Sequence, residues 1–241
     1  MQPDAWGGPP RCHMAARKAW LVDLGLSSYG EAWAWQRGAA DAVRRGQWPD
    51  IVALVEHPPV YTIGRAAHGS KQNLLVDSAE LLVRGIELYE VDRGGDITYH
   101  GPGQVVAYPI IDLNYQQRDL HRYLRNLEEA VIRALAEWNI EGTRTPPHTG
   151  VWVGVDKVAA IGVKASHWVS QHGLALNVCP NLDHFQGIVP CGIPDKGVTS
   201  MERCLGRPIT PDEVKPSLTR HLGEVLGLDL QWAPAAVTPI G

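Results

Sequence analysis

Residues 93–113, RGGDITYHGPGQVVAYPIIDL, join a glycine-rich segment to the longest strand that the sequence predicts. That strand, Gln104–Leu113, is mostly apolar. The segment before it, Arg93–Gln104, holds four glycines and one proline among polar side chains. Because glycine adopts positive φ and lets backbone approach a ligand closely, this composition favours a binding loop between two strands, although plain glycine-rich turns share it. It is not a phosphate-binding loop, since neither GxxxxGK[ST] nor GxGxxG occurs in the chain.

Apolar runs and helix signals alternate on both sides of this stretch. The predicted strands are Ala19–Leu24, Ile51–Glu56, Ile86–Val91 and HGLALNV at 172–178, with a hairpin over GVWVGVDKVAAIGV at 150–163 that turns at Asp156-Lys157. The predicted helices open at Ser28, where Glu31 completes a capping box, at Asp77, at Asp119 to run to Trp138, and at Thr210 before Pro211 and Glu213. Residues 142–150 and 180–201 are predicted loops. Without repeats or a linker, this pattern predicts one α+β domain over residues 19–241, preceded by a loose tail over residues 1–18.

The composition narrows the class of protein. A net charge of −4 over 241 residues argues against a general nucleic-acid binder, which needs a basic surface. No apolar run reaches the roughly 20 residues that a membrane helix requires, and the N-terminal stretch has no apolar core of a secretory signal. The four cysteines, at 12, 179, 191 and 204, have no regular spacing and are expected to be free thiols. We therefore expect a cytoplasmic protein that does not bind membranes.

Cys191 is the candidate nucleophile, in GIVPCGIP at 187–194. A cysteine followed by glycine in a proline-bounded loop can be exposed, with neighbouring backbone N–H groups free to face an oxyanion. Its thiol needs a base or a cation nearby to become the reactive thiolate. The residue types leave four candidate bases open: Lys157, Lys164, His100 and His172. Neither HExxH nor a paired Cys/His spacing occurs, so the sequence predicts no metal site.

Four stretches, in this order, resemble the lipoyl(octanoyl) transferase family: RGGDITYHGPGQ at 93–104, DKVAAIG at 156–162, HGLALNV at 172–178 and PCGI at 190–193. The resemblance covers about Ala19 to Arg203. It implies a mixed sheet flanked by helices, as in the catalytic domains of biotin and lipoate protein ligases. It assigns the family's nucleophile to Cys191 and its lysine base to Lys157. The acyl-substrate contacts that it implies are Arg93, Gly94, Gly95, Asp96, Ile97, Thr98, Tyr99, His100, Ala160, Ile161, Gly162, Gly173, Leu174 and Ala175.

The resemblance also implies the reaction, which is a step of lipoate biosynthesis. Octanoyl arrives as a thioester on the phosphopantetheine arm of acyl carrier protein, and no other cofactor is expected. It passes through a thioester on Cys191 to a lysine of a lipoyl domain of 2-oxoacid dehydrogenases or of the glycine-cleavage H protein. Two alternatives stay open: an ATP-dependent lipoate or biotin protein ligase, and a non-catalytic acyl-binding protein. Since the carrier is acidic, Arg122 and Arg125 on one predicted helix, with Arg44 and Arg45 on another, are a hypothetical docking surface.

Overall fold

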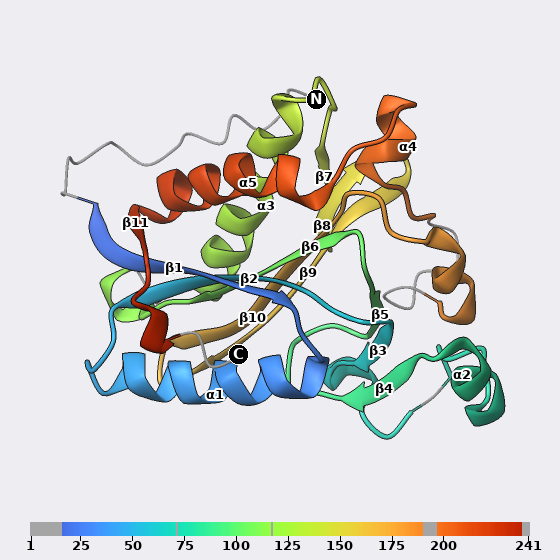
Figure 1. Cartoon of the computed structure of the whole chain (residues 1–241), viewed down its shortest axis with the longest axis horizontal. Helices are drawn as coiled ribbons and strands as arrows, with labels where there is room; N and C mark the ends of the chain where they lie inside the picture. The colour runs from blue at the N-terminus through green and yellow to red at the C-terminus, as the bar shows by residue number, and fades with distance from the viewer. Residues whose placement is uncertain (1–15, 71, 117, 190–196, 238–241) are drawn as a thin grey trace.

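The computed structural model describes residues 16–70, 72–116, 118–189 and 197–237 of the chain. An eight-stranded mixed sheet lies in the middle, in the order β11-β1-β2-β6-β10-β9-β8-β7. Helix α1 covers one face, and helices α3 and α5 cover the other (Figure 1). The strands are β1 (Arg17–Leu26), β2 (Asp50–Glu56), β6 (Gln104–Ile110), β7 (Thr143–Thr145), β8 (His148–Val153), β9 (Asp156–Ser166), β10 (Val169–Asn177) and β11 (Leu228–Trp232). The three helices are α1 (Tyr29–Arg44), α3 (Leu120–Ala136) and α5 (Pro211–Leu226).

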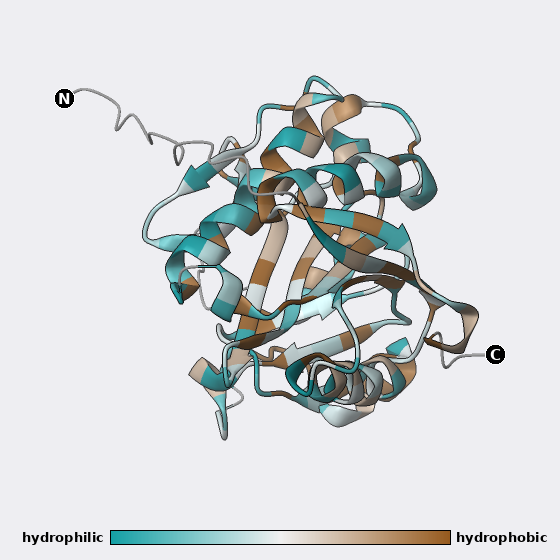
Figure 2. Ribbon diagram, turned by 90° about the vertical axis from the view of Figure 1, so that its left-hand side faces the viewer, coloured by the Kyte–Doolittle hydropathy of each residue, from teal (hydrophilic) through white to brown (hydrophobic). Residues whose placement is uncertain are grey.

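Strand direction divides this sheet in two. β1 is parallel to both β2 and β11, while every pairing from β2 onward, through β6, β10, β9, β8 and β7, is antiparallel. Apolar residues on the strands face helices on both sides, and the polar residues of the helices face outward (Figure 2). The predicted α+β fold with a mixed sheet flanked by helices is therefore confirmed.

A second, three-stranded sheet extends from one end of the first. Its order is β4-β3-β5, and it has its own apolar core, which includes Tyr61, Ile97, Tyr99 and Phe185. Its strands are β3 (Val60–Ile63), β4 (Glu87–Glu90) and β5 (Ile97–His100), accompanied by helix α2 (Ser78–Arg84) and the short 3-10 turns η1 (Arg65–Ala67) and η3 (Leu182–Gly187). The predicted loop over Arg93–Gln104 therefore contains a strand, because four residues between glycines pair with β3.

The predicted helix starts agree with the structure. The Ser28 hydroxyl accepts a hydrogen bond from the Glu31 N–H and donates one to the Glu31 carboxylate at 2.6 Å. Thr210 and Glu213 form a capping box that starts α5, with Pro211 as its first residue. These caps satisfy N–H groups that a helix start otherwise leaves unpaired, each contributing about 1 kcal/mol. Apolar side chains of α3, including Leu127 and Val131, fill the core beside α5.

Three segments differ from the predictions. Residues 142–150, a predicted loop, form the β7–β8 hairpin around Pro146-Pro147. The next turn lies at Gly154-Val155, not at Asp156-Lys157, because Gly154 supplies the positive φ and Lys157 already pairs with Trp152. β6 ends at Ile110 instead of Leu113, followed by the 3-10 turn η2 (Leu113–Tyr115).

The ends of the fold also differ. β11 was not predicted, and it follows Gly227, whose left-handed backbone ends α5. β1 begins at Arg17, which pairs with Leu228, so Arg17 and Lys18 belong to the sheet rather than to the predicted tail. Residues 1–15 of that tail lie outside the described residues. The remaining helix is α4 (Met201–Leu205), and the last turn is η5 (Ala235–Val237). Within the described residues, no helix combines the length and apolar character that crossing a membrane requires.

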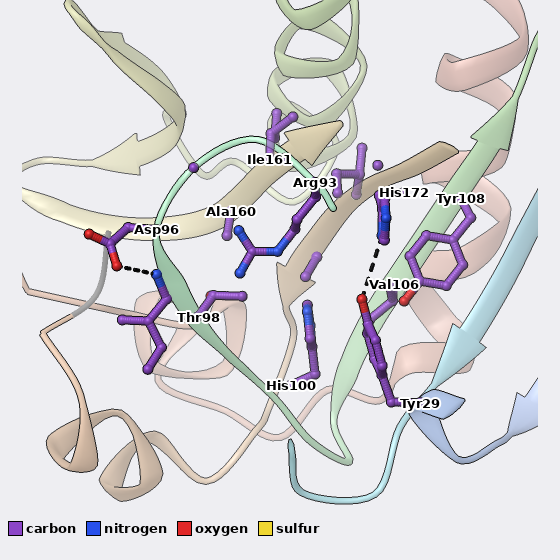
Figure 3. Close-up of a pocket in the computed structure, with 16 residues that line it drawn as sticks. Tyr29, Arg93, Asp96, Thr98, His100, Val106, Tyr108, Ala160, Ile161 and His172 are labelled. Atoms are coloured by element: carbon purple, nitrogen blue, oxygen red, sulfur yellow. Dashed lines mark hydrogen bonds between the residues drawn. The ribbon is translucent and has the colours of Figure 1, made fainter. Parts of the chain in front are cut away.

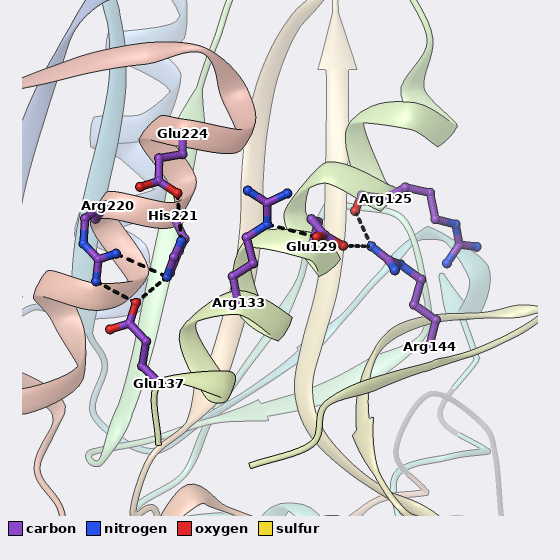
Figure 4. Close-up of polar contacts among 8 residues, drawn as sticks. All are labelled: Arg125, Glu129, Arg133, Glu137, Arg144, Arg220, His221 and Glu224. Atoms are coloured by element: carbon purple, nitrogen blue, oxygen red, sulfur yellow. Dashed lines mark hydrogen bonds and ion pairs between the residues drawn. The ribbon is translucent and has the colours of Figure 1, made fainter. Parts of the chain in front are cut away.

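Ion pairs hold the outer faces of α3 and α5 (Figure 4). Arg144 bridges Glu128 and Glu129, at 3.1 and 2.7 Å, and thereby ties the β7–β8 hairpin to α3. Arg125 also contacts the fully buried Glu128, at 2.6 Å. Arg44 and Arg45 of the docking hypothesis both pair with Asp41. Arg125, Arg44 and Arg45 thus form ion pairs within the chain, and their role in docking an acidic partner stays a prediction.

Glu137, just past the end of α3, joins α3 to α5. Its carboxylate accepts hydrogen bonds from Arg220 at 2.6 Å and from Ser217 at 2.9 Å, and it contacts His221 at 2.5 Å. The bond from Arg220 is the main reason that the Glu137 pKa is lowered from its ordinary value to about 2. Because the folded pKa is depressed, this contact stabilises the fold above the unfolded pKa and is lost as pH falls toward about 2.

We expect Glu137→Gln to lower the melting temperature at pH 7, because the variant cannot carry the charge that Arg220 binds. The difference from the native protein should shrink as pH falls from about 4.5 toward about 2. Calorimetry or circular dichroism over this pH range measures it, with the exposed Gln231→Ala as control. A difference that stays constant with pH would contradict this electrostatic role.

Candidate active site

A pocket opens on the α1 side of the large sheet, between the middle strands and the segment that leads into β5 (Figure 3). β9 and β10 supply its floor, where Ala160 pairs with Ala175 and Gly162 with Gly173. The first residue of α1, Tyr29, and two side chains of β6 complete the wall. The lining residues are Tyr29, Arg93, Gly95, Asp96, Ile97, Thr98, His100, Val106, Tyr108, Ala160, Ile161, Gly162, His172, Gly173, Leu174 and Ala175.

The structure brings the predicted acyl contacts together, with two exceptions. Gly94 and Tyr99 do not line the pocket. The Gly94 N–H donates to the Val163 carbonyl at 2.9 Å, so its backbone fastens the 93–95 segment to β9. Tyr99 points into the core of the small sheet, where its hydroxyl contacts His184 Nδ1 at 2.7 Å. The others line one cavity, and their roles toward a substrate stay predictions.

Four lining residues lie outside the predicted acyl contacts. His172 was predicted only as a candidate base, and the sequence analysis missed Tyr29, Val106 and Tyr108. Val106 and Tyr108 lie on the same face of an apolar strand, a pattern that predicts a core position. Nothing in the sequence marks this face of β6 as a pocket wall. Tyr29 follows the N-cap of α1, a position that ordinarily serves packing. The register of β6 against β10, which sets Val106 opposite Ala175, identifies the two β6 residues, and the position of α1 identifies Tyr29.

Close backbone packing explains the glycines of the floor. A Cβ on Gly173 would lie 2.1 Å from the Ala107 carbonyl oxygen, and one on Gly162 would lie 2.9 Å from the Gly94 carbonyl oxygen. Any side chain would therefore push β10 from β6, or push the 93–95 segment off β9. The small residues are needed by the protein's own backbone, in addition to the room for a ligand that the sequence predicts.

Arg93 fixes the upper wall of the pocket. Its buried guanidinium donates to the carbonyl and hydroxyl oxygens of Thr62 on β3, at 2.6 and 2.8 Å. It also donates to the Gly94 carbonyl at 3.0 Å. The segment after Arg93 is pinned at Asp96, which accepts from the Asn73 amide at 2.7 Å and from the Ile97 N–H at 2.6 Å. Polar residues of the glycine-rich motif thus hold the 93–96 segment to the small sheet, and the Gly94 N–H joins that segment to β9.

A chain of buried amides runs from the pocket to Lys157. The Gln104 oxygen accepts from His100 Nδ1 at 3.2 Å, and its nitrogen donates to the Asn177 oxygen at 2.9 Å. Asn177 donates to the Thr199 carbonyl at 3.0 Å, and the Thr199 N–H donates to the Lys157 carbonyl at 2.9 Å. Because an amide oxygen only accepts, His100 carries its proton on Nδ1. Burial keeps the pKa of His100 well below its ordinary value, so the ring is neutral at pH 7.

Lys157 is buried at the start of β9, three residues before the Ala160 floor position. Its ammonium nitrogen lies 4.7 Å from the centre of the Trp152 ring, within the range of a cation–π contact. The Lys157 N–H donates to the Gly197 carbonyl at 2.9 Å, so this lysine is held by the segment that begins at Gly197. Cys191 lies outside the described residues.

The other candidate bases and thiols have different surroundings. Lys164 and His172 both contact Asp92, at 2.6 and 2.8 Å, on the far side of the pocket from Lys157. Cys179 is half-buried, and burial raises the pKa of its thiol, while Cys204 is exposed in α4. No cluster of ligating side chains suited to a metal ion occurs among the described residues.

Comparison with known proteins gives a consistent result. The model of the lipoyl protein ligase A/B catalytic domain matches residues 28–223. An octanoyltransferase of Rubrobacter xylanophilus is 52% identical over 204 residues, covering 84% of this chain and 91% of that protein. An octanoyltransferase of Gloeobacter violaceus is 44% identical, covering 90% of this chain and 93% of that protein. Among solved structures, a bi-partite lipoate protein ligase from Thermoplasma acidophilum has a TM-score of 0.70 at 19% identity, covering 90% of this chain and 87% of that one. That likeness confirms the fold predicted from the resemblance.

We expect Gln104→Ala to reduce the free energy of unfolding by about 1–3 kcal/mol, because it leaves buried partners on Asn177, Tyr99 and His100 unsatisfied. Gln231→Ala removes an exposed amide that donates to Asp229, and it should change the free energy of unfolding by no more than about 0.5 kcal/mol. Urea denaturation of both variants measures the difference. Equal effects would show that the buried amide chain does not stabilise the site.

Proposed function

The chain belongs to the lipoyl protein ligase A/B catalytic-domain family, and from this premise we propose that it transfers an octanoyl group to a lysine of a lipoate-dependent protein domain. Its relatives are curated octanoyltransferases, and it is accordingly an acyltransferase that acts in lipoate biosynthesis. One observation carries the substrate assignment: a pocket with small residues on its floor starts three residues from a buried lysine on the same strand.

The shape and lining of the pocket suit an acyl chain. Ala160, Ala175 and Val106 form an apolar row across β9, β10 and β6, nearest to Lys157. Beyond it, Gly162 and Gly173 leave backbone exposed to the cavity. Such a narrow, mostly apolar slot with a few fixed polar groups is the usual form of a small-ligand site. The acyl carbonyl lies at the Lys157 end, and the alkyl chain extends toward Tyr108.

The donor is an acyl thioester on the phosphopantetheine arm of acyl carrier protein, and no other cofactor takes part. Lys157 accepts the thiol proton of Cys191, and the thiolate forms a bond to the acyl carbonyl carbon. The bond from that carbon to the carrier sulfur breaks, and the carrier thiolate recovers the proton from Lys157. Exchange of one thioester for another is nearly isoenergetic, so the step needs no ATP. Backbone N–H groups near the nucleophile stabilise the oxyanion.

The second half-reaction makes the amide. The amine of the acceptor lysine attacks the acyl-enzyme carbonyl, and the bond to the Cys191 sulfur breaks. Lys157 takes the proton of the attacking amine and returns it to the Cys191 thiolate, which restores the thiol. One proton is released to solvent for each amide formed, because the acceptor enters as an ammonium ion. The acceptors are lipoyl domains of 2-oxoacid dehydrogenases and the glycine-cleavage H protein, and the reaction takes place in the cytoplasm.

Two features of the described residues support Lys157 as the base. It is buried, and its ammonium nitrogen faces the Trp152 ring at the start of β9, three residues before Ala160. Its backbone pairs on both sides with the segment Gly197–Thr199, which begins six residues after Cys191 in the sequence. The family resemblance and this pairing together favour Lys157 over Lys164, whose ammonium is occupied by Asp92.

The alternative with a specific observation in its favour is an ATP-dependent lipoate protein ligase, because such a ligase shares the fold. The two functions differ in their acyl donor. Purified protein should octanoylate an apo-lipoyl domain from octanoyl-carrier protein without ATP, and mass spectrometry of the domain detects the product. Modification that occurs only from free octanoate with ATP would show that the protein is a ligase and not a transferase.

We expect Cys191→Ala to abolish transfer from octanoyl-carrier protein, because the variant cannot form the acyl-enzyme. Cys179→Ala and Cys204→Ala should each keep turnover within a few-fold of the native protein. The measurement is the initial rate of lipoyl-domain octanoylation. Native turnover in the Cys191 variant would refute the covalent route.

We expect Lys157→Ala to lower kcat by roughly 10²–10⁴, the usual contribution of a positioned general base. Lys18→Ala, which removes an exposed lysine of β1, is the control and should leave kcat unchanged. Steady-state kinetics with octanoyl-carrier protein separates the two. If Lys157→Ala lost less than a few-fold, another group would have to accept the thiol proton.

A further inference from the structure

Lys157 and Ala160 face the same side of the large sheet, although they are three positions apart on β9. Ala160 lines the pocket. Val151 of β8 packs in the core beneath α3, so its neighbour Trp152 faces the other way, and the Lys157 ammonium lies over the Trp152 ring. Side chains of a regular strand alternate between faces, so residues three apart ordinarily point in opposite directions. An irregularity in β9 must therefore turn Lys157 to the pocket side.

A β-bulge between β8 and β9 provides this turn. Val151 of β8 pairs with Ala159. The next residue of β8, Trp152, pairs with Lys157, so Val158 is an extra residue on β9. Val158 and Ala159 accordingly both pack into the core beneath α3. A bulge bends its strand and re-aims the neighbouring side chain, so without Val158 as the extra residue Lys157 would point toward α3.

Gly150 lets β8 pack closely against the bulge. Its φ of 132° favours glycine, and a Cβ at this position would lie 2.7 Å from the Ala159 carbonyl oxygen. The same Cβ would lie 3.4 Å from Lys157 Cε and 3.4 Å from Trp152 Cη2. The lysine side chain therefore lies against the bare backbone of Gly150 and the buried Trp152 ring.

A buried carboxylate on α3 holds Gly150 in this position. The Gly150 N–H donates to Glu128 Oε1 at 3.1 Å. Glu128 Oε2 accepts from Arg125 at 2.6 Å and from Arg144 at 3.1 Å. The Glu128 side chain is fully buried, and a carboxylate in such a place is costly unless its oxygens are paired. The arginines balance the charge at Oε2, and Oε1 fixes the backbone of β8.

Attachment of the β7–β8 hairpin to α3 does not depend on this bond. Arg144 also donates to Glu129 at 2.7 Å and to the Arg125 carbonyl at 3.3 Å (Figure 4). Loss of the bond from Gly150 to Glu128 would leave these contacts in place and release the part of β8 that lies against Lys157. The bond therefore serves the geometry of β8 beside the lysine.

We propose that Glu128 is a positioning residue for Lys157: its bond to Gly150 fixes β8 against the β9 bulge, which turns the lysine to the pocket face. A base must lie within hydrogen-bond reach of the proton that it accepts, and a displacement of about 1 Å can cost roughly 100-fold in rate. This inference rests on the proposed function and on Lys157 as its base. Glu128 acts from the opposite face of the sheet, through β8.

Two conservative variants separate position from charge. Glu128→Asp keeps the charge beside the arginines but draws the carboxylate back from Gly150, so kcat should fall roughly 10- to 100-fold while KM for octanoyl-carrier protein stays within about threefold of native. Glu128→Gln keeps an oxygen in reach of Gly150 and should keep kcat within about threefold, although its melting temperature should fall. Native kcat in a folded Glu128→Asp, or an equal loss in Glu128→Gln, would overturn the proposal.

Glu129→Ala is the matched control for these variants. The Glu129 carboxylate is the next one along α3, and it binds Arg133 and Arg144 on the outer face of the helix. Its removal should leave kcat at the native value. A loss as large as that of Glu128→Asp would show that the whole ion-pair cluster matters, which would overturn a specific role of Glu128.

A double-mutant cycle shows whether Glu128 acts through the lysine. In the Lys157→Ala background, Glu128→Asp should lower kcat less than about twofold, because no base remains to be positioned. A general effect on the fold would lower kcat by the same factor in both backgrounds, and this result would overturn the proposal. Thermal unfolding verifies that each variant is folded, and Gly150→Ala replaces Glu128→Asp in the cycle if that variant is not.

The native protein and Lys157→Ala serve as the references for this experiment. Absence of octanoyl transfer by the native protein would refute the proposed function, and native kcat in Lys157→Ala would refute the assignment of the base. Transfer that depends on Lys157 but not on Glu128 would overturn the positioning role alone. The expected result is transfer that depends on both residues, with a loss from Glu128→Asp that disappears once Lys157 is removed.

Discussion

The pairing of β10 with β9 on one side and with β6 on the other is the constraint on which the site depends. Two rows of the pocket floor, Ala160–Ala175 and Gly162–Gly173, come from these strands, and each row combines residues far apart in sequence. A slip of one residue in an antiparallel pair would turn every side chain to the opposite face. The glycines prevent that slip, because only Gly173 fits against the Ala107 carbonyl and only Gly162 fits beneath Gly94. The register therefore fixes the pocket floor and its separation from Lys157 along β9.

The glycine-rich motif serves the structure as much as the chemistry. Arg93 binds Thr62, Gly94 binds Val163, and Gln104 begins the buried amide chain. These bonds attach the small sheet to the large one and form the upper wall of the pocket. The amide chain continues to the backbone of Lys157, so a change in the motif also affects the Lys157 end of β9. One continuous set of hydrogen bonds therefore joins the pocket wall to Lys157.

The sequence predicted the long helices well, because caps such as Ser28 and Thr210 and the apolar stripe of α3 are local signals. The short strand β5 and the 142–150 hairpin were missed, since their pairing depends on partners distant in the chain. Most pocket residues were located through motif resemblance, which needs no geometry. Tyr29, Val106 and Tyr108 carry no such motif, and only the strand register and the position of α1 reveal them.

Transfer through a thioester on Cys191 is the step on which the proposed function depends. The most direct measurement is the mass of the intact protein after incubation with octanoyl-carrier protein, without ATP and without an acceptor domain, followed by peptide mapping. The account predicts one octanoyl group per chain, on the peptide that contains Cys191, and its removal when an apo-lipoyl domain is added. An unmodified protein that still transfers octanoyl, or a modification on another residue, would contradict it.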